Sequence, residues 1–202
     1  MYARRQVSNG MNLFPKKTKG LSLLETVIYI FISVLIIIVI SEIFVNQSTL
    51  GQKRTSQSDL DISAGAGIET IKAAIQGAST VVPSRSFGGT AYTSDEDTLI
   101  LEIPSIDGSG NLVLGSYDYM VFFIDPSDAT LLKATTDSAA GSARPENTRI
   151  ISSFVSSVEF RYNKASVAAS TAIDATVTTA KTLGTGTFSA KSHAKVNLRN
   201  KQ

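Results

Sequence analysis

Residues 16–44 read KKTKGLSLLETVIYIFISVLIIIVISEIF, and this stretch sets the interpretation of the rest of the chain. The basic run that opens it stops at Gly20, and between Leu21 and Ser41 the only charged residue is Glu25. As an α-helix, these 21 residues would extend about 31 Å, which matches the roughly 30 Å hydrocarbon core of a bilayer. The sequence therefore predicts a helix that can span a membrane and that carries one carboxylate near its start.

Glu25 is the unusual residue of this segment. A charged side chain in the middle of a membrane helix costs about 2.5–3.5 kcal/mol on insertion scales, and such a residue usually has a partner. An ordinary secretory signal peptide has an apolar region of about 7–15 residues followed by a small-residue cleavage site. Here the apolar run is longer and no such site follows it. A plain membrane anchor would account for the hydropathy but would leave Gly20 and Glu25 unexplained.

Gly20, Leu21 and Glu25, placed between a basic leader and a long apolar run, resemble the class III cleavage signal of type IV prepilins. The resemblance covers about 30 of the 202 residues and implies that a prepilin peptidase cuts between Gly20 and Leu21. It also implies that Leu21 becomes an N-methylated amino terminus, and that Leu21 and Glu25 of neighbouring subunits pair during assembly. Leu21 stands where phenylalanine is most usual, and Glu42 stands where many major pilins carry a kink-forming proline.

Charge divides the chain into two parts. The formal net charge is +2, but residues 1–20 hold five cations and no acids, so the remainder carries a net charge of about −3. The positive-inside rule places that leader in the cytoplasm and the chain after Ser41 outside. A negatively charged exported part argues against a nucleic-acid partner, which would need cations facing its phosphates. Met11 is an alternative to Met1 as the translation start, and the sequence leaves the two open.

These boundaries give the expected domain organisation. We expect a prepilin leader at 1–20, a transmembrane or filament-core helix at 21–45, the amphipathic half of the same helix at 46–80, and an extracytoplasmic β-rich globular domain at 81–202.

The second half of the helix has one apolar face. Apolar residues recur there at steps of three and four, which is typical of a helix with one buried side; they are Leu60, Ala64, Ile68, Ile71 and Ile75. Gly65 and Gly67 lie inside the same helix, where each costs up to about 1 kcal/mol relative to alanine. They mark either a flexible point or a close approach to the sheet.

Short runs rich in apolar, β-branched and aromatic residues follow the helix and predict strands. They are Leu99–Ile103, stopped by Pro104; Tyr117–Ile124, stopped by Pro126; Ala129–Ala134; a two-part run over Arg149–Asn163; Ala175–Ala180; and Ala194–Arg199. Loops are expected over 135–147 and 163–174. A helix followed by four to seven strands without alternating helices predicts an α+β fold. This layout resembles the pilin fold, in which an antiparallel sheet packs on the outer half of the long helix.

The sequence offers little chemistry. It has no cysteine and a single histidine, His193, and no catalytic set can be assembled around it, so we expect no enzyme and no cofactor. Asp107, Ser109 and Asn111 alternate like the first half of a Ca²⁺ loop, but the glycine and glutamate that an EF-hand requires are missing. A glycine-rich turn between strands is the favoured interpretation, and Ca²⁺ binding is kept as a hypothesis.

We therefore expect a structural subunit, a minor pilin or pseudopilin, that moves from a single-pass position in the cell membrane into an extracellular filament. Its expected partners are other pilin subunits, the prepilin peptidase, an inner-membrane assembly platform and the membrane itself. The sequence leaves open a major or minor role, and an adhesion or motility pilus, a type II secretion pseudopilus or a competence pilus. The alternative is an anchored adhesin or binding module, for which the aromatic candidates are Phe87, Tyr92, Tyr117 and Tyr119.

The cleavage hypothesis makes a direct prediction. Mass spectrometry of the membrane-extracted protein should find an amino-terminal peptide that begins at Leu21 and carries a methyl group. Gly20→Leu removes the small residue at the cut, so this variant should stay full-length in the membrane. An intact leader on the wild-type chain, in cells that contain a prepilin peptidase, would contradict the prediction.

Overall fold

The computed structural model describes residues 22–184 and 186–199. The leader, the cleavage position at Gly20–Leu21 and both candidate start residues, Met1 and Met11, lie outside the described residues. The chain divides into two compact units, residues 1–49 and 50–202.

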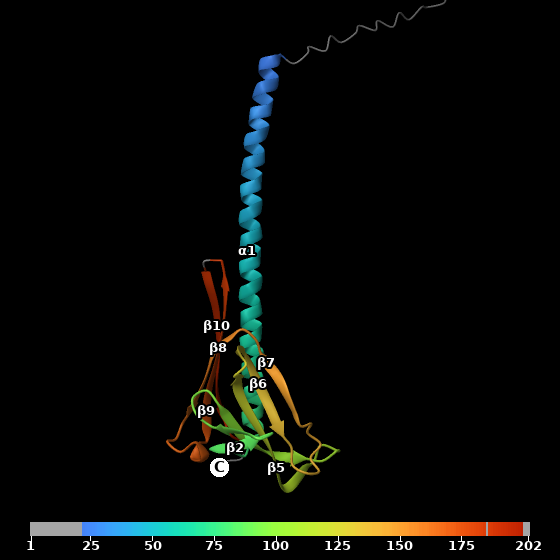
Figure 1. Cartoon of the computed structure of the whole chain (residues 1–202), viewed down its shortest axis with the longest axis vertical. Helices are drawn as coiled ribbons and strands as arrows, with labels where there is room; N and C mark the ends of the chain where they lie inside the picture. Colours follow the sequence, from blue (N-terminus) through green and yellow to red (C-terminus); the bar gives the residue numbers. More distant parts are fainter. Residues whose placement is uncertain (1–21, 185, 200–202) are drawn as a thin grey trace, which may run out of the picture. The chain divides into compact units, whose positions relative to one another are not determined.

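One helix, α1 (Leu23–Gly77), precedes all the strands (Figure 1). This order confirms the predicted long helix and the α+β class. The described residues form ten strands: β1 (Thr80–Val81), β2 (Ser84–Phe87), β3 (Thr90–Thr93), β4 (Leu99–Ile106), β5 (Leu112–Asp125), β6 (Asp128–Asp137), β7 (Asn147–Ser152), β8 (Val155–Tyr162), β9 (Ala172–Leu183) and β10 (Gly186–Asn197). A short 3₁₀ turn, η1 (Val167–Ala169), lies between β8 and β9.

The strands of the second unit form two sheets and a separate hairpin. The larger sheet has the order β1-β4-β5-β6-β7, the smaller one β10-β9-β8, and β2 pairs only with β3. Every pairing is antiparallel. The expectation of one sheet on the helix is therefore wrong in detail, because the chain changes sheets between β7 and β8.

The outer half of α1 joins the two sheets through a common core. All five residues of the predicted apolar face (Leu60, Ala64, Ile68, Ile71 and Ile75) are buried, which confirms the amphipathic interpretation. Ile68, Ile71 and Ile75 share one core cluster with side chains from both sheets, among them Leu101 and Phe122 of the larger and Phe160, Ile173 and Val177 of the smaller. Neither sheet could bury its apolar side without this helix.

The β2–β3 hairpin contributes to a second, smaller core, and the strand prediction missed it. Phe87 is buried there with Ile100, Val121 and Phe123 of the larger sheet. The hairpin turns at Gly88 and Gly89, whose φ angles of 54° and 87° are those of a two-residue turn that glycine favours. Its strand sequences, SRSF and TAYT, carry too few apolar residues to give a strand signal.

Several strand ends differ from expectation. Pro104 does not stop β4 but lies inside it, opposite Tyr117 of β5. A proline is tolerated at this position because β1 pairs only with Leu101 and Glu102, which leaves the other edge of β4 open beyond them. β9 and β10 are also longer than predicted. In the first half of β10, Gly186 and Ser189 interrupt the apolar pattern that would predict a strand.

The helix lies close to the chain where β7 passes into β8. A Cβ atom on Gly67 would lie 3.1 Å from Cβ of Ser152, whereas a Cβ on Gly65 would meet nothing within 4 Å. Beside Gly67, the Ser63 hydroxyl accepts from the Ser153 N–H (2.8 Å) and donates to the Ser153 carbonyl (2.8 Å). Gly67 is thus the close approach that the sequence allowed for, and Gly65 has no such role.

This difference predicts opposite effects for one substitution at two neighbouring sites. Gly67→Val places a branched side chain against Ser152 and should lower the free energy of unfolding by about 1–3 kcal/mol, the usual cost of overpacking. Gly65→Val faces open space and should be neutral or slightly stabilising, because valine is a better helix former than glycine. Denaturant unfolding followed by tyrosine fluorescence measures both. Equal effects at the two sites would refute the close approach.

Candidate functional site

The first unit presents an apolar helix surface. Every large hydrophobic side chain from Leu23 to Val45 is exposed, with exposed fractions between 46% and 85%. Within the described residues, α1 is the one helix long and apolar enough to cross a membrane. Apolar area on this scale far exceeds what a soluble monomer leaves in water, so lipid or other protein chains must cover it.

Ser22 caps the start of this helix. Its hydroxyl accepts a hydrogen bond from the backbone N–H of Glu25 (3.2 Å), and its carbonyl accepts from the N–H of Thr26 (3.0 Å). A serine three residues before a glutamate is the sequence pattern of a capping box. The spacing of Ser22 and Glu25 is thus a signal for the helix start that hydropathy alone does not provide. An acidic residue in the first turn also interacts favourably with the helix dipole.

The Glu25 carboxylate has no partner inside the described part of the chain. Neither a hydrogen bond nor an ion pair to it is found among residues 22–184 and 186–199. The next cation along α1 is Lys53, about 42 Å further at 1.5 Å per residue. Gly20 and Leu21, the residues assigned to processing and assembly beside it, lie outside the described residues.

The Ca²⁺ candidates lie together in the turn between β4 and β5. Asp107 Oδ1 accepts from the backbone N–H groups of Ser109 (2.8 Å) and Asn111 (2.9 Å), and Oδ2 accepts from Asn111 Nδ2 (3.3 Å). These hydrogen bonds lower the pKa of Asp107. The loop's own donors thus satisfy both carboxylate oxygens. In the described ranges, no group of three or more acidic or histidine side chains is placed to hold a metal ion.

The remaining residues singled out from the sequence do not form one surface. His193 of β10 contacts Asp174 of β9, and this pair is exposed. Of the four aromatic candidates for an adhesin, Phe87 is buried, and Tyr92 and Tyr119 pack against the same small core. Tyr117 alone of the four is exposed, at 40%.

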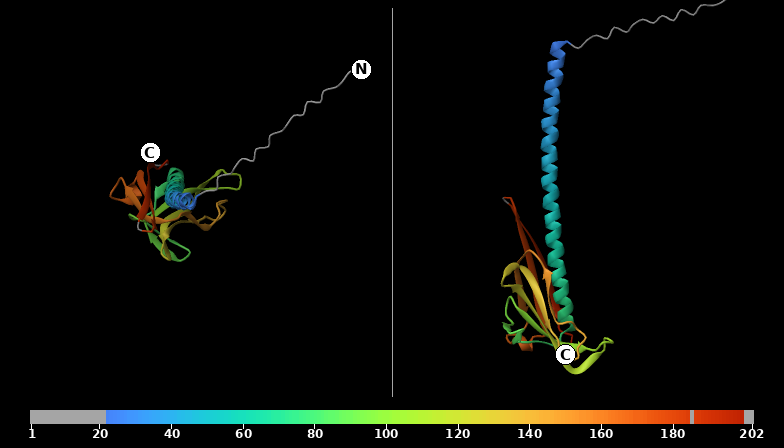
Figure 2. Two further views of the ribbon diagram at one scale, coloured as in Figure 1. Left: turned by 90° about the horizontal axis from the view of Figure 1, so that it is seen from above. Right: turned by 45° about the vertical axis from the view of Figure 1, so that its right-hand side comes forward.

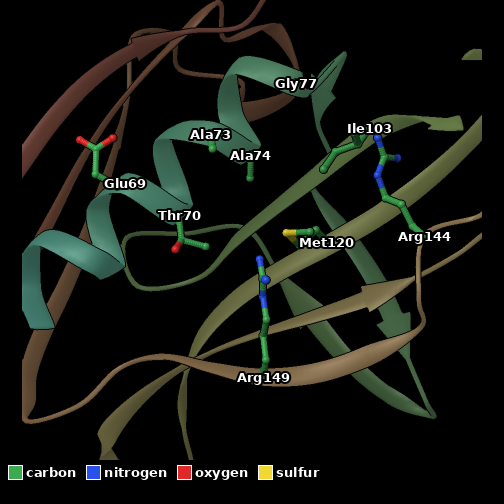
Figure 3. Close-up of a pocket in the computed structure, with 9 residues that line it drawn as sticks. All are labelled: Glu69, Thr70, Ala73, Ala74, Gly77, Ile103, Met120, Arg144 and Arg149. Carbon is green, nitrogen blue, oxygen red and sulfur yellow. The ribbon is translucent and has the colours of Figure 1, made fainter. Parts of the chain in front are cut away.

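A hollow of about 510 Å³ lies between the last turns of α1 and the larger sheet (Figure 3). Figure 3 shows Met120 and Ile103 at the sheet side and Ala73 and Ala74 on the helix. Arg149 and Arg144 reach it from β7 and from the loop before β7, and no sequence pattern pointed to them. Its lining is mainly apolar, which suits a packing contact rather than a reaction.

Arg144 belongs to a buried polar centre on Asp118 of β5. The Asp118 carboxylate accepts hydrogen bonds from Ser105 Oγ (2.8 Å), the Ala139 N–H (2.9 Å), Ser142 Oγ (2.8 Å) and Arg144 (2.6 Å). Burial raises the pKa of Asp118, but these hydrogen bonds outweigh it and leave the pKa below its ordinary value. The centre fixes the loop over 138–146 to the sheet.

No family model, no curated protein and no solved structure matches this chain. The candidate site therefore rests on geometry alone: it is the apolar surface of α1, capped by Ser22, with a Glu25 carboxylate that has no partner within the described residues. The Asp118 centre is structural.

The Asp118 centre gives a stability prediction with a matched control. Asp118→Ala leaves the Arg144 guanidinium and three further donors without their acceptor and should lower the free energy of unfolding by about 1.5–3 kcal/mol. Asp137→Ala removes a half-exposed partner of Arg85 (2.7 Å) and should cost about 0–1 kcal/mol. Denaturant unfolding of both variants at neutral pH tests the comparison, and an equal loss would refute the special role of Asp118.

The pH dependence of the same measurement provides a second readout. A lowered pKa means that Asp118 stabilises the fold above the unfolded-state pKa, about 3.9, and that this stabilisation is lost as pH falls through the lower folded-state value. The difference between wild type and Asp118→Ala should therefore shrink below about pH 4. A difference that stays constant down to pH 2 would contradict the assignment.

Proposed function

We propose that this chain is a structural subunit of a type IV pilus-like filament, a minor pilin or pseudopilin, cleaved after Gly20 and assembled through its N-terminal helix. The observation that carries the proposal is the exposed apolar surface of α1 with one carboxylate, Glu25, near its capped start, for which residues 22–184 and 186–199 offer no partner. The prepilin peptidase would supply the free amino terminus at Leu21, and an inner-membrane platform would feed subunits into the filament.

An all-round apolar helix suits both places that such a subunit occupies. The bilayer interior and a core of packed helices both exclude water, so the helix can exchange one for the other without exposing its side chains. The Ser33 hydroxyl does not obstruct this exchange, because it donates to the Tyr29 carbonyl (2.8 Å) within the helix.

Transfer from the bilayer to the filament core changes the free energy of the Glu25 carboxylate. An ion pair at 4 Å is worth about 1 kcal/mol in water and about 4 kcal/mol at an effective dielectric constant near 20. Packed among helices, the Glu25 carboxylate would gain from the Leu21 ammonium of a neighbouring subunit, which is a partner that its own helix does not supply. Glu25 thus acts in assembly and register, and the second unit forms the outer surface of the filament.

The proposal predicts that Glu25→Ala separates assembly from membrane insertion. Removing the carboxylate relieves a cost in the bilayer, so insertion and cleavage should be unharmed. In the filament it leaves a neighbouring ammonium buried and unpaired, a penalty of about 3–5 kcal/mol, so incorporation should fall more than tenfold. Immunoblots of sheared filaments and of membranes measure the two pools.

Glu42→Ala is the matched control. Glu42 is a second carboxylate on α1 but lies beyond the apolar run that ends at Ser41, so its removal should leave incorporation near the wild-type level. Wild-type amounts of the Glu25→Ala protein in filaments would defeat the assembly role. An equal loss for both variants would show that any charge change on this helix disturbs assembly.

A further inference from the structure

The hairpin of β9 and β10 extends beyond the rest of its sheet. The two strands pair over their whole length, from Ala172 opposite Asn197 to Leu183 opposite Gly186. β8 follows β9 only as far as Thr179. The last residues of the hairpin, 180–183 and 186–189, therefore form a two-stranded ribbon that no third strand supports.

Two hydrogen bonds fix the direction in which this ribbon runs. Thr179 Oγ1 donates to the Leu60 carbonyl (3.0 Å), and Gln57 Nε2 donates to the Ser189 carbonyl (3.2 Å). The hairpin thus runs beside α1 toward lower residue numbers, as Figure 2 shows. Four more residues of strand add about 13 Å, the rise of about nine helix residues, which brings the tip level with residues near 51.

Near this position along the helix axis, cationic and apolar side chains occur without acidic ones. Residues 178–192 contain Lys181 and Lys191 and no acidic residue, and residues 43–58 contain Lys53 and Arg54 and no acidic residue. The tip itself carries Leu183 and Phe188, both partly exposed.

Lys181 lies over the ring of Phe154, with its ammonium 4.9 Å from the ring centroid. No ion pair to Lys53, Arg54 or Lys181 occurs within residues 22–184 and 186–199, so their charges are available to a partner.

Cations around a few apolar side chains match the chemistry of an anionic lipid surface, which attracts Lys and Arg and accepts apolar groups at the headgroup boundary. Along the chain, Lys53 and Arg54 are the first cations after the apolar run of α1, separated from it by Glu42 and the uncharged segment 43–52. We propose that the β9–β10 tip, with Lys53 and Arg54, rests on the anionic headgroup surface of the membrane in which α1 is anchored. This inference relies on the membrane-anchored state of the proposed function.

The chain contains no tryptophan, so a single introduced tryptophan reports on one position. We would place the full-length protein in vesicles of phosphatidylglycerol and phosphatidylcholine that carry bromine near the headgroups. Leu183→Trp and Phe188→Trp should lose most of their fluorescence. Leu114→Trp is the control, because Leu114 is 95% exposed at the start of β5, and it should keep its fluorescence.

Charge dependence tests the lipid chemistry. Quenching at Leu183→Trp should weaken in vesicles of phosphatidylcholine alone, and also when Lys53, Arg54 and Lys181 are changed to glutamine in the same chain. Unchanged quenching in both cases would overturn the electrostatic part of the proposal. Blue-shifted emission that no brominated lipid quenches would show that a protein, such as a second copy of this chain, covers the tip, and would overturn the proposal as a whole.

Phe31→Trp separates this inference from the proposed function. Phe31 lies in the apolar run, so its tryptophan should be quenched by bromine deep in the acyl chains if α1 is inserted. Quenching at Phe31→Trp without quenching at Leu183→Trp would refute the surface contact alone. No quenching at Phe31→Trp would refute the membrane anchoring that the proposed function requires.

Discussion

Burial of one face of α1 between two sheets is the constraint on which the second unit depends. Leu60, Ile71 and Ile75 are completely buried, and full burial of such a side chain contributes about 1.5–3 kcal/mol. Because Ile71 and Ile75 share one core cluster with residues of both sheets, the helix face is the element that holds the sheets together. Each sheet by itself is a thin antiparallel layer with an apolar side that would otherwise face water.

The part of the same helix that lies in the first unit differs in how its apolar side chains are exposed. From Leu23 to Val45 its large hydrophobic side chains are exposed on every side, and residues 22–184 and 186–199 cover none of them. One continuous α1 thus combines a segment that needs an external apolar environment with a segment whose single apolar face is satisfied internally. We expect the function to depend on the first segment, because its apolar surface is the one that the described part of the chain leaves exposed.

Much of this arrangement could be predicted from the sequence, because hydrophobic periodicity is a local signal. The spacing of Leu60, Ile68 and Ile75 predicted the buried helix face, and the β-branched and aromatic runs located seven of the ten described strands. The β2–β3 hairpin was not predicted, because its strands are polar and its stability depends on residues that are distant in the sequence. One such contact is the stacking of Arg85 on the Tyr119 ring at 3.4 Å. The Asp118 centre was not predicted for the same reason, since its acceptor on β5 and its donors on β4 and in the loop over 138–146 come from three separate segments.

The candidate site was predictable in part. Glu25 was identified from the sequence because a single carboxylate in an apolar run is rare. The helix cap at Ser22 could have been predicted as well, from the spacing between this serine and Glu25.

The bonds between α1 and the strands also have a mechanical meaning. Ser63 binds the chain between β7 and β8, Thr179 binds the Leu60 carbonyl, and Gln57 binds β10, so three attachments lie along about two turns of the helix. A pull along the helix axis would load these bonds and the buried face together, in shear, instead of peeling them apart one by one. A force applied to the outer half of the helix would therefore move the folded second unit together with it.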